Sequence, residues 1–466
     1  MPPKKSKKTA VTPTTAPELL DAGVDEEDHG DRWISSGDPA KAVRFYQRAC
    51  KFYAQAIEID GRRSSVSLDS LYNVARIQFL VYSKVVKTGV LEDIAGNIDQ
   101  DNENFPAVVH DLRAIELTHE TAIELGARID ATPALDLLHN YAQVLVEAGE
   151  EQNSVEQFAK AFQLMDDIVG RETVELASML SATDEDDEVE DITRGEDSES
   201  VTTEVHATEN DSIVTPTNLL ETLISYVQGL SSFCSLILDN SLSLDNSEEI
   251  YAKGGDLVDK IGQLLAEFGD SMKTTYSIDQ HHIEEGFLAV AQYNSTITIL
   301  KSLASNNLPG LSPTILDSIW DHTNLDTQSR YMAQSDALIE LAGVLSNSED
   351  STLLTTSWTA YTAASKLLTA ALTRSQGFQT QAVSAQRKLY TAKGDIEYLR
   401  SRLQIPAAAN NQTVLLQNAI TFYSNVINLS SLGTTLDDQL IIQEAKRKKE
   451  ALTLKNFAQW QLAHDF

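Results

Sequence analysis

The sequence predicts an all-α protein, and three observations carry this prediction. Apolar residues recur at spacings of three and four over most of the 466 residues, which is the periodicity of one helix face. Only 11 prolines and 21 glycines interrupt the chain, whereas a protein of many short strands needs frequent turns. Hydrophobic residues make up 42% of the chain, enough to build a core.

The N-terminal end carries no apolar pattern, and we predict that residues 1–24 form a disordered, basic and polar tail. Its basic run, Lys4–Lys8, could serve as a nuclear import signal. It has no apolar core of the kind that a secretory signal requires. Since no run of about 18 uninterrupted apolar residues occurs, we expect no membrane-spanning segment.

The clearest pattern lies in residues 26–60. Gly30 has no side chain and would let one helix approach its neighbour closely. Trp33, three residues later, is expected to fill the space between the two helices. These two residues predict a helix that packs along a second one.

A turn and a second helix follow directly. Gly37 supplies a backbone conformation that ends the first helix, and Asp38 can cap the second. Pro39 suits the first helical position, where its missing N–H costs nothing. Small residues then flank a large one at helical spacing on one face: Ala42, Tyr46 and Ala49.

Two later segments repeat parts of this pattern. Residues 71–76, which include Ala75, are expected to start a second helix pair. In the next match Ala142 takes the small position at the helix crossing and Gly149 the turn. Phe158 and Ala161 then fall on the helix that follows.

Two glycine motifs further on are predicted to be turns. Gly394-Asp395 follows a large residue and precedes a new apolar run, as Gly37-Asp38 does, so we expect it to separate two helices. Gly254-Gly255 lies between two helical stretches and reads as a turn.

The spacing of small and large residues resembles the tetratricopeptide repeat. The resemblance covers residues 26–170 and 385–430, whereas residues 215–384 are helical by pattern with a weak repeat register. It implies a right-handed α-solenoid of antiparallel helix pairs whose concave face holds a peptide or helix of a partner protein. The last helix, at about 437–462, is expected to cap the open end with a polar face.

The composition changes abruptly between Asp184 and Asp211, where thirteen acidic residues face a single arginine. Such a segment cannot bury enough apolar area to offset its ordering entropy, so we expect it to be disordered. The predicted organisation is therefore a tail (1–24), N-terminal repeats (25–181), an acidic linker (182–213) and C-terminal repeats (214–466). The first acidic residues of this linker are candidate partner-binding groups: Asp184, Glu185, Asp186, Asp187, Glu188, Glu190 and Asp191.

The net charge of −33 narrows the choice of partner. A surface this acidic repels nucleic acid phosphates and attracts basic proteins. Direct nucleic acid binding is therefore not expected, although Arg44, Arg48 and Lys51 lie beside the aromatic Tyr46 and Tyr53. The alternative explanation of the charge is solubility alone.

The resemblance also implies candidate recognition residues. In chaperone-binding members of the superfamily, asparagines at the positions of Asn73 and Asn140 help to hold the C-terminal carboxylate of a client peptide, and Arg76 could contribute. The alternative is that these asparagines are exposed in the groove or hydrogen-bonded to the next repeat.

No motif in the sequence indicates chemistry. Phosphate-binding loops, nucleophile elbows and HExxH are absent. Cys50 and Cys234 are expected to be buried, and His281-His282 to lie at a polar helix start rather than to bind metal. We therefore expect no metal, no cofactor and no enzyme activity.

These observations together predict a non-enzymatic tetratricopeptide-like adaptor or chaperone, cytoplasmic or nuclear or both. It would escort a basic client such as a ribosomal protein, in ribosome biogenesis, or a histone. The alternative is a structural subunit of a larger complex, with an undetected enzyme as a third hypothesis. The basic run Lys446–Lys449 is a second import signal, a contact for an acidic partner or a solvated helix face.

Overall fold

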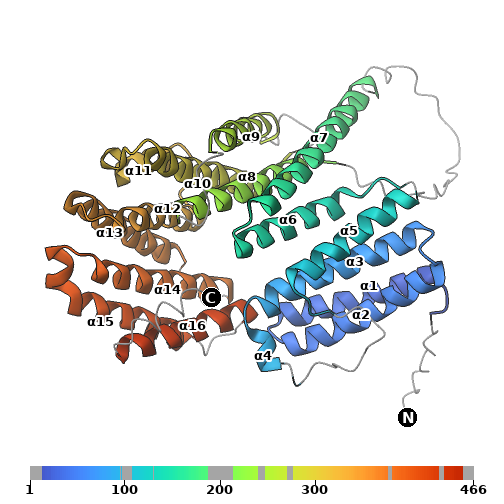
Figure 1. The fold of residues 1–466 in the computed structure, drawn as a ribbon, viewed down its shortest axis with the longest axis horizontal. Coiled ribbons are helices and arrows are strands. Elements are labelled where there is room, and N and C mark those ends of the chain that lie inside the picture. Colours follow the sequence, from blue (N-terminus) through green and yellow to red (C-terminus); the bar gives the residue numbers. More distant parts are fainter. Residues whose placement is uncertain are drawn as a thin grey trace, which may run out of the picture. The chain divides into compact units, whose positions relative to one another are not determined.

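The computed structural model is helical throughout the residues that it describes, which confirms the predicted all-α class (Figure 1). Those residues are 13–94, 96, 108–129, 131–186, 214–239, 247–269, 277–375, 380–429 and 435–454, and they contain no strand. The predicted import run Lys4–Lys8 lies outside them, as do Asp187, Glu188, Glu190 and Asp191 of the acidic segment.

The chain divides into two compact units. Unit 1 comprises the residues up to Glu151 and those from Asp326 onward; unit 2 is Gln152–Leu325. The predicted ranges 25–181 and 214–466 cut across this division, because helices from both ends of the chain belong to unit 1.

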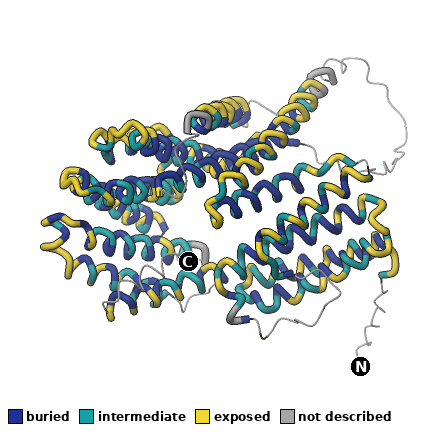
Figure 2. Tube along the Cα trace, viewed as in Figure 1, coloured by how far each residue is buried: buried dark blue, intermediate teal, exposed yellow. Residues whose placement is uncertain are grey.

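Unit 1 contains most of the helices. They are α1 (Ala16–Ser35), α2 (Pro39–Asp60), α3 (Ser65–Val81), the π-helical turn η1 (Tyr82–Val86), α4 (Val90–Ile94), α5 (Leu112–Arg128), α6 (Leu135–Gln152), α12 (Gln328–Ser346), α13 (Ser351–Arg374), α14 (Thr380–Arg402), α15 (Pro406–Asn428) and α16 (Leu436–Thr453). Unit 2 contains α7 (Val155–Asp186), α8 (Pro216–Leu238), α9 (Ser247–Phe268), α10 (Gln280–Ala304), the 3-10 turn η4 (Leu308–Gly310) and α11 (Pro313–Asp321). Among these, α8 is buried along most of its length (Figure 2).

The first helix begins within the predicted tail, which is therefore drawn too long. The side chain of Thr15 accepts a hydrogen bond from the backbone N–H of Glu18, and the Glu18 side chain bonds back to Thr15. This capping box satisfies donors that the first turn would otherwise leave unpaired. Leu19 and Gly23 are buried on the inner face of α1. The cap and these two buried positions are signals that the polar composition conceals.

Helices α1 and α2 pack closely because two glycines of α1 lie under tyrosine rings of α2. A Cβ on Gly30 would overlap the Tyr46 ring, and a Cβ on Gly23 would overlap the Tyr53 ring. The Tyr46 hydroxyl also donates to Asp31 at 2.7 Å. The predicted role of Gly30 in close packing is confirmed, whereas the matching position Gly23 was not predicted.

The turn between α1 and α2 forms as the sequence indicates. Gly37 has a φ of 81°, a conformation that favours glycine, and the Asp38 side chain accepts from Lys41 N at 3.0 Å. Trp33 is only partly buried, and the Lys41 ammonium lies 4.0 Å from its ring centroid. Seven predicted repeat residues are fully buried: Ala42, Tyr46, Ala49, Ala75, Ala142, Phe158 and Ala161.

Three glycine turns predicted from the sequence are wrong. Gly394 lies inside α14, where a Cβ would overlap the Tyr423 ring, and Gly254 lies inside α9 under Tyr293. Gly149 is buried within α6, which instead ends before Asn153, a residue with a φ of 50°. Glycine on the buried face of a helix permits close approach, and these glycines serve that purpose rather than breaking a helix.

The last described helix, α16, differs from the prediction that it caps an open array with a polar face. Leu436 and Leu440, in its first turns, pack into an apolar cluster with Ala42, Val43 and Val81 of α2 and α3. The Gln439 side chain reaches Gly37 O at 3.5 Å. Helix α16 therefore joins the two chain ends within unit 1.

Both cysteines, Cys50 and Cys234, are free and buried, as predicted. Their surroundings are apolar, and burial raises the pKa of the Cys50 thiol well above its ordinary value. A thiol held in its neutral form is a poor nucleophile, so Cys50 is a core residue.

Candidate partner-binding surface

The first helix displays a row of exposed acidic side chains. Glu18, Asp21, Asp25 and Asp28 are all exposed. Their spacing of three, four and three residues places them on one face of α1, opposite the face that packs on α2. Hydrogen bonds from the backbone N–H groups of Thr14 and Thr15 lower the pKa of Glu18, so this carboxylate is charged at neutral pH. We call these four residues the α1 acidic row.

Basic side chains line the outer face of α2. Arg44, Arg48 and Lys51 are exposed, and Arg48 pairs with Glu26 of α1 at 2.6 Å. The neighbouring aromatic residues Tyr46 and Tyr53 are fully buried. Buried rings cannot stack on nucleic acid bases, so Tyr46 and Tyr53 offer no stacking platform to single-stranded nucleic acid.

The predicted residue Arg76 lies on α3 and reaches across to α1. Its guanidinium pairs with the Glu27 carboxylate, which also accepts a hydrogen bond from the Tyr53 hydroxyl at 2.8 Å. Burial raises the pKa of Glu27, and the Arg76 charge opposes that shift. Arg76 therefore links three helices through one buried carboxylate.

The two predicted asparagines lie on α3 and α6. Asn73 is partly buried on α3, next to Tyr72. The Asn140 amide donates to the Tyr72 hydroxyl and to Asp136 O, both at 2.8 Å. The structure thus brings Asn73 and Asn140 onto helices joined by a hydrogen bond, which runs from Asn140 on α6 back to Tyr72 on α3.

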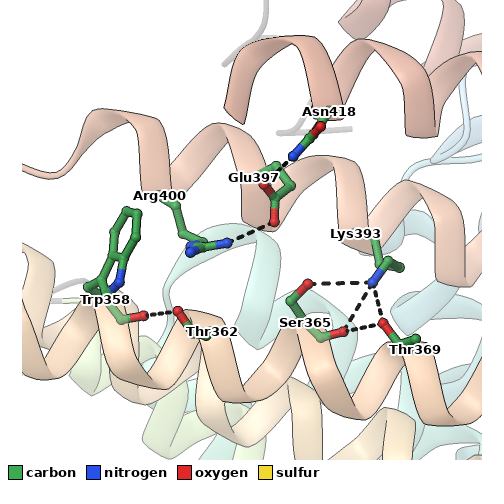
Figure 3. Close-up of polar contacts among 8 residues, drawn as sticks. All are labelled: Trp358, Thr362, Ser365, Thr369, Lys393, Glu397, Arg400 and Asn418. Atoms are coloured by element: carbon green, nitrogen blue, oxygen red, sulfur yellow. Dashed lines mark hydrogen bonds and ion pairs between the residues drawn. The ribbon is translucent and has the colours of Figure 1, made fainter. Parts of the chain in front are cut away.

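A polar network that the sequence did not predict connects α13 with α14 (Figure 3). Lys393 of α14 is buried, and its ammonium donates to Ser365 O at 3.1 Å and to Thr369 Oγ1 at 2.6 Å. Burial lowers the pKa of Lys393. Two hydroxyl-bearing residues of α13 thus receive a lysine that would otherwise be costly to bury.

The same network continues one and two turns along α14. The Glu397 carboxylate accepts from Arg400 at 2.9 Å and from Asn418 of α15 at 3.2 Å. The Arg400 guanidinium lies 4.2 Å from the Trp358 ring centroid, a favourable cation–π contact (Figure 3). Charged residues at i, i+4 and i+7 are the signal that could have revealed this network, because they mark one face of the helix. Its contacts join side chains of α13, α14 and α15, so the network fixes these helices against one another.

The other predicted site residues that the structure describes lie at the ends of helices. Asp184, Glu185 and Asp186 fall at the end of α7, with the rest of the acidic segment outside the described residues. His281 and His282 lie in the first turn of α10, which Asp279 caps at 3.0 Å, so the predicted polar helix start is confirmed. Within the described ranges no group of three or more potential ligands could hold a metal ion.

No helix among the residues that the structure describes is both long and apolar enough to cross a lipid bilayer. Compared with protein-family models, with curated proteins and with solved structures, the chain has no match.

Proposed function

We propose that this chain is a non-enzymatic, tetratricopeptide-like protein that binds a Lys/Arg-rich partner protein as an adaptor or chaperone. The observation that carries the proposal is the α1 acidic row, because it places fixed negative charge on a folded surface of a chain whose net charge is −33. Such a surface attracts basic proteins and speeds their association. A ribosomal protein or a histone has the required composition.

The pattern of contacts supports stacked antiparallel pairs as the finer architecture. Gly23 packs against Tyr53 and Gly30 packs against Tyr46, so residue numbers increase along α1 as those of their partners on α2 decrease, as in an antiparallel pair. The same order joins α14 to α15, where Gly394 meets Tyr423 and Glu397 meets Asn418. Two pairs from opposite ends of the sequence therefore share one packing rule.

The test is affinity capture with the full chain at low and high salt, followed by mass spectrometry. We expect a basic protein at near-equal stoichiometry that is lost at high salt, because exposed charges are screened there. A variant with Asp21→Asn, Asp25→Asn and Asp28→Asn should retain less of it. Glu18 stays unchanged in this variant because it belongs to the capping box.

The matched control neutralises three exposed acids that lie far apart in the sequence, Glu124→Gln on α5, Glu349→Gln between α12 and α13, and Glu450→Gln on α16. It changes the net charge equally but leaves the row intact, so capture should stay close to that of the wild type. Capture of no basic protein would refute the proposal. A single large complex that survives high salt would instead identify the chain as a structural subunit, the alternative function.

A further inference from the structure

Unit 2 contains an apolar groove whose floor is α8. A cavity of about 320 Å³ is lined by α7, α8 and α9 near Phe158, Tyr226 and Ile250. A second cavity of about 280 Å³ is lined by the same three helices near Leu176, Leu223 and Leu264. We call the two cavities together the α8 groove, with floor residues Leu219, Leu223, Tyr226, Leu230 and Phe233.

The two cavities lie in register along one face of α8. The floor residues are spaced by four, three, four and three positions, so they form a single helical stripe. From the first cavity to the second the lining positions fall along α8 and rise along both α7 and α9. At 1.5 Å per residue the centres of the two cavities are roughly 13 Å apart along α8.

The first cavity has aromatic walls and a charged mouth. Phe162 stacks on Tyr226 with ring centroids 5.5 Å apart, and Phe158 meets Phe233 edge-on at 5.1 Å. Lys253 of α9 and Asp166 of α7 form an ion pair at the mouth. These side chains are 35% and 50% exposed, and ion pairs this exposed contribute little to stability, so a ligand can displace this one.

The charge of the three helices defines the sign of an occupant. Helix α7 has eight acidic and two basic residues, α9 has five acidic and two basic, and α8 has a single glutamate, giving a net charge of −10. The cavity linings themselves hold two acids, Asp166 and Glu267, and two lysines, Lys253 and Lys260, so the excess negative charge lies on these helices outside the linings. A cationic segment complements the net charge of the three helices as a whole. The acidic segment between α7 and α8 has the wrong sign to occupy the cavities.

We propose that the α8 groove binds an amphipathic, Lys/Arg-rich α-helix of a partner protein. Two large apolar side chains, two to three turns apart on that helix, enter the two cavities, and its basic residues face Asp166, Glu267 and the net negative charge of α7 and α9. This is the helix-in-groove mode, in which a three-walled channel receives a fourth helix. The inference rests on the proposed function for the basic character of the partner.

The test uses the full-length chain and a fluorescein-labelled synthetic peptide of about 18 residues, built from alanine and lysine with leucines on one face. Ala159 and Ala177 are exposed residues of α7 that line the first and second cavities. The double variant Ala159→Phe and Ala177→Phe fills both cavities without touching the floor. Fluorescence anisotropy should show saturable binding to the wild type and a Kd at least about tenfold higher for the double variant.

Ala266→Phe is the matched control, because Ala266 is exposed on α9 and lines neither cavity. It should leave the Kd unchanged, and a glutamate version of the peptide should bind much more weakly than the lysine version. An unchanged Kd in the double variant, or equal binding of the two peptides, would overturn the inference.

Two further results would assign the groove to another occupant and also overturn the inference. One is a wild-type dimer in light scattering that becomes a monomer in the double variant, since a second copy would then fill the groove. The other is markedly tighter peptide binding after removal of residues 455–466, since the chain's own C-terminal segment would then compete.

The groove and the proposed function fail in distinguishable ways. If affinity capture with the double variant retains the salt-sensitive basic protein in full, the groove inference fails and the proposed function stands. If the wild type captures no basic protein, the proposed function fails whatever the peptide does.

Discussion

A tyrosine ring laid over a helical glycine is the recurring contact at the scale of single residues. Four such pairs occur among the described residues: Gly23–Tyr53, Gly30–Tyr46, Gly254–Tyr293 and Gly394–Tyr423. In two of them the hydroxyl reaches the aspartate that follows the glycine, Asp31 at 2.7 Å and Asp395 at 2.6 Å. Glycine within a helix is destabilising by roughly 0.5–1 kcal/mol relative to alanine, and the close packing of the ring offsets that cost.

Replacing one of these glycines should therefore destabilise unit 1. Gly30→Ala places a Cβ inside the Tyr46 ring, so we expect a loss of about 1–3 kcal/mol in the free energy of unfolding, measured by urea titration. Gly343→Ala is the control, because a Cβ at this position in the last turn of α12 meets no atom within 4 Å. It should stabilise the chain by about 0.5–1 kcal/mol, and a Gly30→Ala variant that behaves the same way would contradict the packing role.

A buried histidine should make stability depend on pH. His119 is fully buried and stacks on Tyr141, and burial lowers its pKa below the ordinary 6.5. The unfolded chain therefore takes up a proton at higher pH than the folded chain. The contribution that neutral His119 makes to the free energy of unfolding is therefore fully present above pH 6.5. It is lost as the pH falls toward the pKa of His119 in the folded protein.

The measurement is the urea midpoint of the wild type and of His119→Phe at about pH 7.5 and pH 5.5. Phenylalanine keeps the ring stack and removes the proton site. Wild type should lose more stability on acidification than the variant does. An equal loss in both proteins would show that His119 does not control the acid response.

Residue roles were predictable where several local signals agree. At Gly37 the glycine, the capping Asp38 and Pro39 coincide, and the turn forms as expected. Gly394-Asp395 has no proline after it, and the apolar spacing continues through Ile396. Gly-Asp alone therefore cannot separate a turn from a packing position, because both need the missing Cβ.

At the scale of helices, α16 is held by charges that are themselves buried. Arg387 of α14 and Asp438 of α16 pair at 2.8 Å with both side chains fully buried. Lys448, further along α16, pairs with Asp395 of α14 at 3.0 Å and is also fully buried. Buried pairs of this kind fix register more than they add stability.

Removing one partner of the first pair should be costly. Arg387→Met leaves Asp438 as an uncompensated buried charge, so we expect a loss of about 3–5 kcal/mol in the free energy of unfolding. Arg374→Met is the control, since its pair with Asp326 is exposed and should cost less than about 1 kcal/mol. Similar urea midpoints for the two variants would contradict the assigned role of Arg387.

The helices themselves were largely predictable, whereas their charged faces were not. The run Lys446–Lys449 suggested an import signal, a contact or a solvated face, yet Lys448 is buried. Its partner Asp395 lies 53 positions away, beyond any local pattern. The acceptors of Lys393 likewise lie on another helix, α13, so the spacing of charges along α14 marks a face but does not identify its partners.

At the scale of the whole chain, the predicted boundary at the acidic segment does not match the division into units. Leu436 is buried in the apolar cluster of α2 and α3, and Lys84 pairs with Asp437 at 3.5 Å. Contacts over such sequence separations carry no periodic signal, so reading along the chain finds helices but not their partners. The class of fold was accessible from sequence; the membership of each unit was not.

Leu436→Asp tests this division. An aspartate in the apolar cluster should loosen α16 from the N-terminal helices, because an unpaired buried charge is strongly unfavourable. Hydrogen exchange should then accelerate in α2, α3 and α16, whereas α8 and α10 of unit 2 stay protected. Uniform acceleration in all of these helices would contradict the two-unit description.

The acidic segment should contribute to partner binding through charge alone. Deleting residues 184–211 removes thirteen acidic residues and one arginine, which leaves a net charge of −21. We expect a higher Kd for the basic partner at low salt and a smaller difference at high salt, measured by titration at two ionic strengths. An unchanged Kd at low salt would remove the segment from the mechanism.

The contact between Gln439 and Gly37 joins positions 402 residues apart, and this separation sets the order in which the nascent chain can mature. Unit 2 emerges from the ribosome entirely before the helix that completes unit 1. Until then the apolar side of α2 and α3 that packs against Leu436 stays exposed to solvent, where it can aggregate or bind a chaperone. A message truncated shortly before codon 436 would therefore yield a protein with one finished unit and one that cannot finish.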